Sequence, residues 1–270
     1  GYVYVSPDEE VGDEYDVVES DAGGTYRSPE PVDDGDGGGE STLASPNEIN
    51  TTGAASDFFS ASPIQTENVE SLLTDDQLVA AASAFSLIEQ SATTNLGEIQ
   101  AHFSDKPSGD RPGSFSTVDD ENLRGDVFFE AESLDEVAQL VNSALASFNP
   151  ASGAITAFPD NIDDLPEDVK DGIVSDGDAV ENIFLHEMGH AIQQMKLEKE
   201  NSPTTARGLL NTMKSGSLPE NKLKEEISTR ATSNGLEAAA EMFVYQLRGN
   251  ELPEELQELY EQKGGVEVDV

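Results

Sequence analysis

The sequence lacks cysteine and tryptophan altogether, and it contains only three histidines among 270 residues. Without cysteine there is no disulfide framework, no thiolate nucleophile and no cysteine-ligated metal site. Any protein ligands to a metal ion must therefore be histidines and carboxylates.

Positive charge is also scarce, with 14 basic against 55 acidic residues and a net charge of −41. Binding to nucleic acid or to an anionic membrane is opposed by this charge, so we expect neither partner. Residues 1–64 carry fifteen acidic residues and one basic residue, so forty and thirteen remain elsewhere (55 − 15 and 14 − 1). A surface this acidic is typical of proteins that work in concentrated salt, where charge repulsion is screened. We infer a halophilic source.

Long apolar runs are missing too, and no stretch approaches the roughly 18 apolar residues of a membrane span. No signal-peptide pattern opens the chain. The start at Gly1 without methionine suggests a piece of a longer parent polypeptide. Localisation stays open apart from a high-salt environment, such as a haloarchaeal cytoplasm or a virion.

Composition changes along the chain predict four parts and an α+β fold. The first is a small β-rich segment, where alternating and aromatic residues favour a hairpin. A Gly-, Pro- and Ser-rich acidic stretch follows and is predicted to be a linker. The third part carries the main domain, and a short helix with an acidic tail ends the chain. The predicted boundaries are 1–27, 28–64, 65–250 and 251–270.

Within the main domain, hydrophobic periodicity and capping residues predict a local β-α-β order followed by long helices. The predicted helices are 74–90, 133–148, 179–199, 219–228 and 235–248, and the predicted strands are 127–131 and 153–158. Residues 91–125 and 160–177 are predicted to be loops. His102 falls in the first of these and is predicted to be an ordinary loop residue.

The helix 179–199 contains the motif His186-Glu187-Met188-Gly189-His190, which uses two of the three histidines. Residues four apart lie on one helix face, so His186 and His190 can bind one Zn²⁺. This HExxH pattern is typical of zinc peptidases, in which the glutamate acts as general base. The pattern predicts a zinc site with Glu187 as that base.

A hydrolytic zinc site needs a third protein ligand and one open position. Glu237 lies on the helix 235–248, on a different face from its apolar stripe, and best meets this requirement. Glu241, one turn later, is the alternative ligand.

The segment from Ser228 to Phe243 resembles the second signature of anthrax-toxin lethal-factor-like zincins, roughly S-x-Y-A-x-x-N-x-x-E-x-x-A-E-x-F. In that family the first glutamate of the signature is the third zinc ligand. The resemblance implies a zincin-like fold, in which a small sheet packs on the HExxH helix and a second helix bears the third ligand. It also implies a gluzincin site whose members are His186, His190 and Glu237 as ligands, Glu187 as base and Glu241 as the group that orients a ligand.

The chain departs from this signature at Arg230, where the family has a tyrosine that helps to stabilise the oxyanion. A guanidinium can also donate to a developing oxyanion, so the expected function is a zinc-dependent endopeptidase acting on a peptide or protein substrate.

The alternatives are an inactive zincin-fold structural or interaction protein and a secreted toxin effector. Zincin domains of this type also occur attached to phage-Mu-F-like minor head proteins, which suggests a virion assembly of haloarchaea as one context.

Overall fold

The structure of the chain is a computed structural model, and it describes residues 3–5, 17–19, 25–27, 43–104, 128–131, 144–149, 153–164, 170, 172–200 and 217–268. The chain divides into two compact units, residues 1–42 and 43–270, and each is considered by itself.

The first unit contains three short strands, β1 (Val3–Val5), β2 (Val17–Glu19) and β3 (Thr25–Arg27). Both β1 and β2 pair antiparallel with β3, which gives the order β1-β3-β2. The hairpin predicted in residues 1–27 is therefore extended by a third strand. Residues 28–42 of the predicted linker lie outside the described residues.

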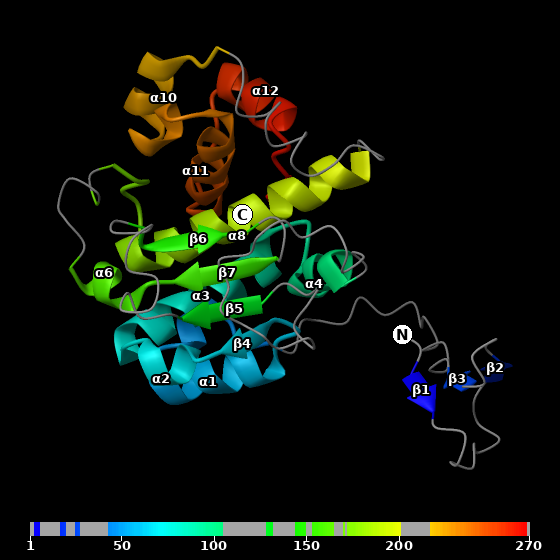
Figure 1. Ribbon diagram of the computed structural model, residues 1–270. Coiled ribbons are helices and arrows are strands. Elements are labelled where there is room, and N and C mark those ends of the chain that lie inside the picture. Colours follow the sequence, from blue (N-terminus) through cyan, green and yellow to red (C-terminus); the bar gives the residue numbers. More distant parts are fainter. Residues whose placement is uncertain are drawn as a thin grey trace. The chain divides into compact units, whose positions relative to one another are not determined.

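The second unit is α+β and mostly helical, as predicted (Figure 1). Its sheet has the order β4-β5-β7-β6. The strands β4 (Gln65–Glu67), β5 (Phe128–Ala131) and β7 (Ala154–Ala157) are parallel, whereas β6 (Ala146–Phe148) pairs antiparallel with β7 at one edge. The predicted strands 127–131 and 153–158 are confirmed as β5 and β7.

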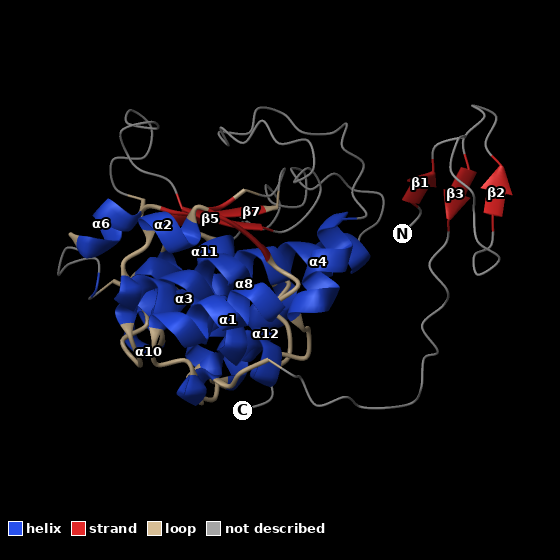
Figure 2. Ribbon diagram, turned by 90° about the horizontal axis from the view of Figure 1, so that it is seen from below, coloured by secondary structure: helices blue, strands red, loops and turns tan. Residues whose placement is uncertain are grey.

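Two long helices, α3 (Asp75–Ser91) and α8 (Ala179–Glu200), pack against each other in the helical layer that faces the sheet (Figure 2). The helix α3 begins with the predicted capping box, in which the Thr74 side chain accepts from the Gln77 N–H. Its apolar stripe is buried, including Leu78, Phe85 and Ile88. Both helices are confirmed within one residue of their predicted ends.

Helical elements occupy several segments that were predicted to be irregular. The predicted linker 28–64 contains η1 (Pro46–Glu48) and α1 (Thr52–Ala61), which follows the N-cap Thr51. Phe58 and Phe59 of α1 are buried, and the Phe59 ring packs edge-on to Phe85 with centroids 5.7 Å apart. The predicted loop 91–125 begins with α4 (Leu96–Ser104), because Leu96, Ile99 and Phe103 form a buried helical stripe. These two predictions are wrong for those residues, and 105–125 lie outside the described residues.

The predicted helix 133–148 is wrong at its end, where residues 146–148 form the edge strand β6. Ala146 pairs with Ala157 and Phe148 with Ile155, so pairing with β7 overrides the helical spacing there. Residues 132–143 lie outside the described residues. The predicted loop 160–177 begins with the short helix α6 (Pro159–Asp163), which has proline at its first position.

The remaining described elements are α2 (Val69–Leu72), α10 (Glu220–Glu226), η3 (Arg230–Thr232), α11 (Gly235–Leu247) and α12 (Glu254–Gln262). Three of them, α10, α11 and α12, match predicted helices. The helix α11 packs across α8 and is preceded by η3. In the described part of the chain, no helix combines the length and apolarity that crossing a membrane requires.

Candidate metal centre

One side of α8 packs in the core, and another side carries the two histidines of the HExxH motif. Asp178 begins the helix by accepting from the N–H groups of Val180 and Glu181 at 2.9 and 3.0 Å. The apolar stripe of Phe184, Met188, Ala191 and Met195 is buried in the core, as predicted. The imidazoles of His186 and His190 lie together on another face, with ring centroids 4.7 Å apart.

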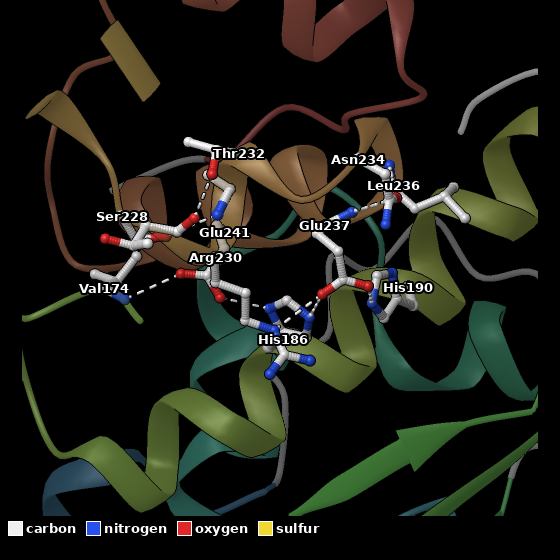
Figure 3. A network of polar contacts seen from close by, with 12 residues as sticks. Val174, His186, His190, Ser228, Arg230, Thr232, Asn234, Leu236, Glu237 and Glu241 are labelled. Atoms are coloured by element: carbon white, nitrogen blue, oxygen red, sulfur yellow. Dashed lines mark hydrogen bonds and ion pairs between the residues drawn. The ribbon is translucent and has the colours of Figure 1, made fainter. Parts of the chain in front are cut away.

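The helix α11 lies close enough to α8 to bring a carboxylate to these histidines. Asn234 caps it by accepting from the N–H groups of Leu236 and Glu237. Gly189, inside the HExxH motif, permits the close approach, because a Cβ there would lie 3.1 Å from Phe243 Cδ1 and 3.5 Å from Ala240 Cα. Glu237 is therefore held on the first turn of α11, facing the two histidines (Figure 3).

His186, His190 and Glu237 form a group whose ligand atoms all lie within 4.8 Å of one another. His186 Nε2 lies 3.1 Å from Glu237 Oε2, and His190 Nε2 lies 3.5 Å from Glu237 Oε1. In the described part of the chain this is the one histidine–carboxylate group that could hold a metal ion. The three residues predicted as ligands are thus brought together by the fold.

Without metal, the close contacts couple the charges of the group. Burial lowers the pKa of His186, but hydrogen bonds to Glu237 and Glu241 outweigh this effect and raise the pKa to about 9. Burial raises the pKa of Glu237, but contacts with His186 and His190 outweigh it and hold that pKa well below the usual range. Without metal, Glu237 is therefore an ionised carboxylate beside a protonated His186, and a bound cation would take the place of that proton.

Glu241 contacts the other side of the His186 ring. Its Oε1 lies 2.6 Å from His186 Nδ1, and its Oε2 accepts from the Val174 N–H at 3.0 Å. Glu241 is 1% exposed and His186 is 3% exposed. A carboxylate on Nδ1 fixes the ring so that Nε2 points at Glu237, which is the orienting role that the resemblance implied for Glu241.

Glu187 and Arg230 stand beside the ligand group with different bonding. Glu187 is 5% exposed, and its charge acts on the guanidinium of Arg230. Arg230 Nε donates to Glu237 Oε2 at 2.9 Å, and its side chain is 38% exposed. Burial lowers the pKa of Arg230, but the charges of Glu237, Glu187 and Glu241 outweigh it and raise that pKa. Arg230 therefore remains a cation at the edge of the group.

Three residues on α8 or in contact with it have positions that the sequence pattern did not reveal. His102 is not a loop residue, because it lies on α4 and its Nε2 lies 2.8 Å from Glu198 Oε2 of α8. Asn182 and Arg248 are hydrogen-bonded to each other at one end of the contact between α8 and α11. A signal for Asn182 was its spacing, four residues before His186 and so on the same helix face.

Comparison with known proteins identifies no relative. No protein-family model, no curated protein and no solved structure matches the chain. The function of the site must therefore be argued from its own geometry.

Proposed function

We propose that the protein is a zinc-dependent endopeptidase with a zincin-like fold of the lethal-factor-like, gluzincin type. The observation that carries the proposal is the convergence of His186, His190 and Glu237. Glu187 follows His186 directly in the chain, is 5% exposed, and its charge acts on Arg230 at the edge of this group. Two histidines and one carboxylate leave a fourth position open for water, which is the arrangement of hydrolytic zinc sites.

The donor set fits zinc in both chemistry and spacing. Imidazole nitrogen and carboxylate oxygen are common zinc donors, with bonds of about 2.0–2.2 Å and a tetrahedral edge of about 3.4 Å. The observed separations of 3.1 and 3.5 Å from the Glu237 oxygens to the two imidazoles are close to that edge. These two distances involve different oxygens of Glu237, and with one ligand atom per residue the separations extend to 4.8 Å, so the side chains must draw together around the ion.

Glu187 is the residue proposed to move protons. Zinc, when bound to His186, His190 and Glu237, would supply a Lewis acid that polarises the scissile carbonyl and lowers the pKa of water to about 7. Glu187 takes a proton from the attacking water as the water oxygen bonds to the carbonyl carbon. It then returns this proton to the leaving nitrogen as the C–N bond breaks, so the carboxylate is regenerated.

Arg230 is proposed to donate to the oxyanion that develops on the carbonyl oxygen. Its Nε is used by Glu237, but its two terminal nitrogens form no hydrogen bond with the described residues. A guanidinium that is 38% exposed and whose terminal nitrogens are not used by the described residues can take this role, which the family gives to a tyrosine.

The edge strand β6 offers a place for an extended substrate. It is the last strand in the sheet order, it pairs only with β7 among the described strands, and it contacts α8. A peptide that adds to this edge would gain main-chain hydrogen bonds and run past the helix that carries His186. We propose this edge as the substrate-binding strand.

The test is metal content and peptide hydrolysis in molar salt, for the parent protein and for Glu187→Gln. We expect about one zinc ion per chain in both proteins, because Glu187 is not a ligand. Turnover should fall by at least about 100-fold in Glu187→Gln, the lower range for loss of a general base.

Two outcomes would contradict the proposal. If the parent protein bound zinc but neither protein hydrolysed a peptide, the zincin-fold structural alternative, such as a virus-head component, would replace the peptidase. If the parent protein bound no metal, the assignment of the ligands would itself be wrong.

A further inference from the structure

Three polar contacts join α8 to α11 and to the C-cap residue of α11, Arg248. They run in opposite directions along the two helices, and the third lies outside the proposed zinc site. His190 meets Glu237, His186 meets Glu241, and Asn182 meets Arg248. On α8 the three members are spaced by four residues, so they share one helix face. We call this row the polar seam.

The outermost contact of the polar seam is well supported by hydrogen bonds. Arg248 Nε and Nη2 both donate to Asn182 Oδ1, at 2.9 and 2.6 Å, and Nη1 donates to Glu181 Oε1 at 3.3 Å. The guanidinium packs over Gly177, where a Cβ would lie 2.6 Å from Arg248 Cζ and where φ is +85°. The position of Arg248 is therefore fixed from three sides.

Asn182 uses its amide nitrogen to hold the chain segment before α8. Its Nδ2 donates to the carbonyl oxygens of Val174 and Asp176 at 2.9 and 2.8 Å, and Asn182 is 2% exposed. The N–H of the same Val174 donates to Glu241 Oε2. The main chain of Val174 is thus held on one side by Asn182 and bound to Glu241 on the other.

From these contacts we infer that Asn182 and Arg248 are positioning residues for the metal centre. They act through Val174, which presents its N–H to Glu241, and through Glu241, which presents Oε1 to His186 Nδ1. The inference rests on the metal centre of the proposed function, and it adds two residues and one loop that lie outside the HExxH motif and the segment from Ser228 to Phe243.

The physical basis is the number of partners of the buried Glu241 carboxylate. Among the described residues it has two, the Val174 N–H and His186. If the Val174 segment shifts, one oxygen is left buried without a donor, and the carboxylate can rotate away from the His186 ring. Loss of such outer partners typically costs 10- to 100-fold in metal affinity.

The experiment compares Asn182→Ala with Gln193→Ala as the matched control. Gln193 is also a buried amide of α8, and its Nε2 donates to the main-chain carbonyl of Lys263 rather than to the Val174 segment. Zinc affinity is measured by competition with a chromogenic chelator. Cobalt is then bound in place of zinc, and its visible absorption spectrum reports the geometry of the ligands.

We expect Asn182→Ala to weaken zinc binding by about 10-fold or more and to change the cobalt spectrum. Gln193→Ala should leave both unchanged even if it destabilises the fold equally. Arg248→Lys, which keeps the charge but loses the paired donors to Asn182, should weaken zinc binding in the same direction. It also serves as the second variant if Asn182→Ala fails to fold.

Equal effects of Asn182→Ala and Gln193→Ala, or an unchanged cobalt spectrum in both Asn182→Ala and Arg248→Lys, would overturn the inference. Absence of zinc binding by the parent protein would overturn it together with the metal centre. A parent protein that binds zinc but hydrolyses nothing would contradict only the peptidase, because the affinity and spectrum of the variants would still report the positioning role.

Discussion

Glu237 and Glu241 lie one turn apart on α11, and their surroundings give them different chemistry. Glu237 faces both Nε2 atoms and is the more exposed of the two, with 21% of its side chain accessible. Glu241 is buried, and its two oxygens are already bonded to His186 Nδ1 and to the Val174 N–H. Only Glu237 therefore has the geometry of a direct ligand beside both imidazoles.

Substitution of these two glutamates should separate a ligand from an orienting group. Glu237→Ala removes one of three protein donors and should weaken zinc binding by more than about 100-fold. Glu241→Ala should weaken it by about 10- to 100-fold, because it removes only the partner of Nδ1. Zinc affinity by chelator competition checks both, and the reverse order would show that Glu241 is the ligand.

The proposed role of Arg230 can be tested by comparing how its substitution changes kcat and how it changes zinc affinity. If its terminal nitrogens stabilise the oxyanion, Arg230→Gln should lower kcat by about 100- to 1000-fold with a much smaller loss of zinc affinity. Arg230→Tyr, which restores the family residue, should retain more turnover than Arg230→Gln. If kcat were unchanged in Arg230→Gln, Arg230 would have no role in stabilising the oxyanion, and its role would be the ion pair with Glu237.

Gly189 links the metal motif to the packing of α8 on α11. Gly189→Ala should strain this contact, because its Cβ would lie 3.1 Å from Phe243 Cδ1. Overpacking costs about 1–3 kcal/mol and alanine in a helix offsets about 1 kcal/mol, so we expect the free energy of unfolding to fall by up to about 2 kcal/mol. Gly53→Ala on α1, where nothing lies within 4 Å, is the control and should not destabilise the protein. Chemical denaturation measures both, and equal effects would contradict the role of Gly189.

The end of α12 is fixed to the following chain by one tyrosine. The buried Tyr260 hydroxyl donates to the Val266 carbonyl at 2.9 Å and accepts from the Val266 N–H at 3.2 Å. Burial raises the pKa of Tyr260, so the hydroxyl stays a donor at ordinary pH. Tyr260→Phe leaves both groups without this partner and should cost about 1–3 kcal/mol. Tyr245→Phe on α11 is the control, because Tyr245 is only partly buried against the core. Equal losses would contradict this role.

The sequence predicted a helix or strand correctly where the residues that stabilise it lie within the segment itself. The helices α3, α8 and α11 have capping residues and long apolar stripes, so their existence and ends were predictable. The strand β6 was not, because its three residues continue a helical pattern and become a strand only by pairing with β7. The helix α1 was hidden by the Ser- and Gly-rich composition around Phe58 and Phe59.

The same distinction applies to the candidate site. The spacing of His186 and His190 is local, and it places both side chains on one face of α8. The Asn182–Arg248 contact joins residues 66 apart, and no local pattern pairs them. Contacts of this kind depend on how α8 and α11 cross, which is set by the whole core.

Across the whole molecule, the net charge of −41 opposes compaction unless it is screened. Few of the described acidic residues are paired with cations, since Lys and Arg together number only 14 in the chain. The Debye length falls from about 10 Å at 0.1 M to about 3 Å at 1 M salt, so repulsion between neighbouring surface carboxylates is removed mainly in that range.

The melting temperature should therefore rise between 0.1 and 2 M KCl. A gain of about 1–2 kcal/mol would correspond to a rise of about 2–8 °C for a domain of this size. Sucrose at equal osmolality is the control, because it is excluded from protein surfaces but does not screen charge. A rise in KCl that clearly exceeds the rise in sucrose would show that screening is the cause. A melting temperature that does not change in KCl would contradict adaptation to salt, and the acidic surface would then need another explanation.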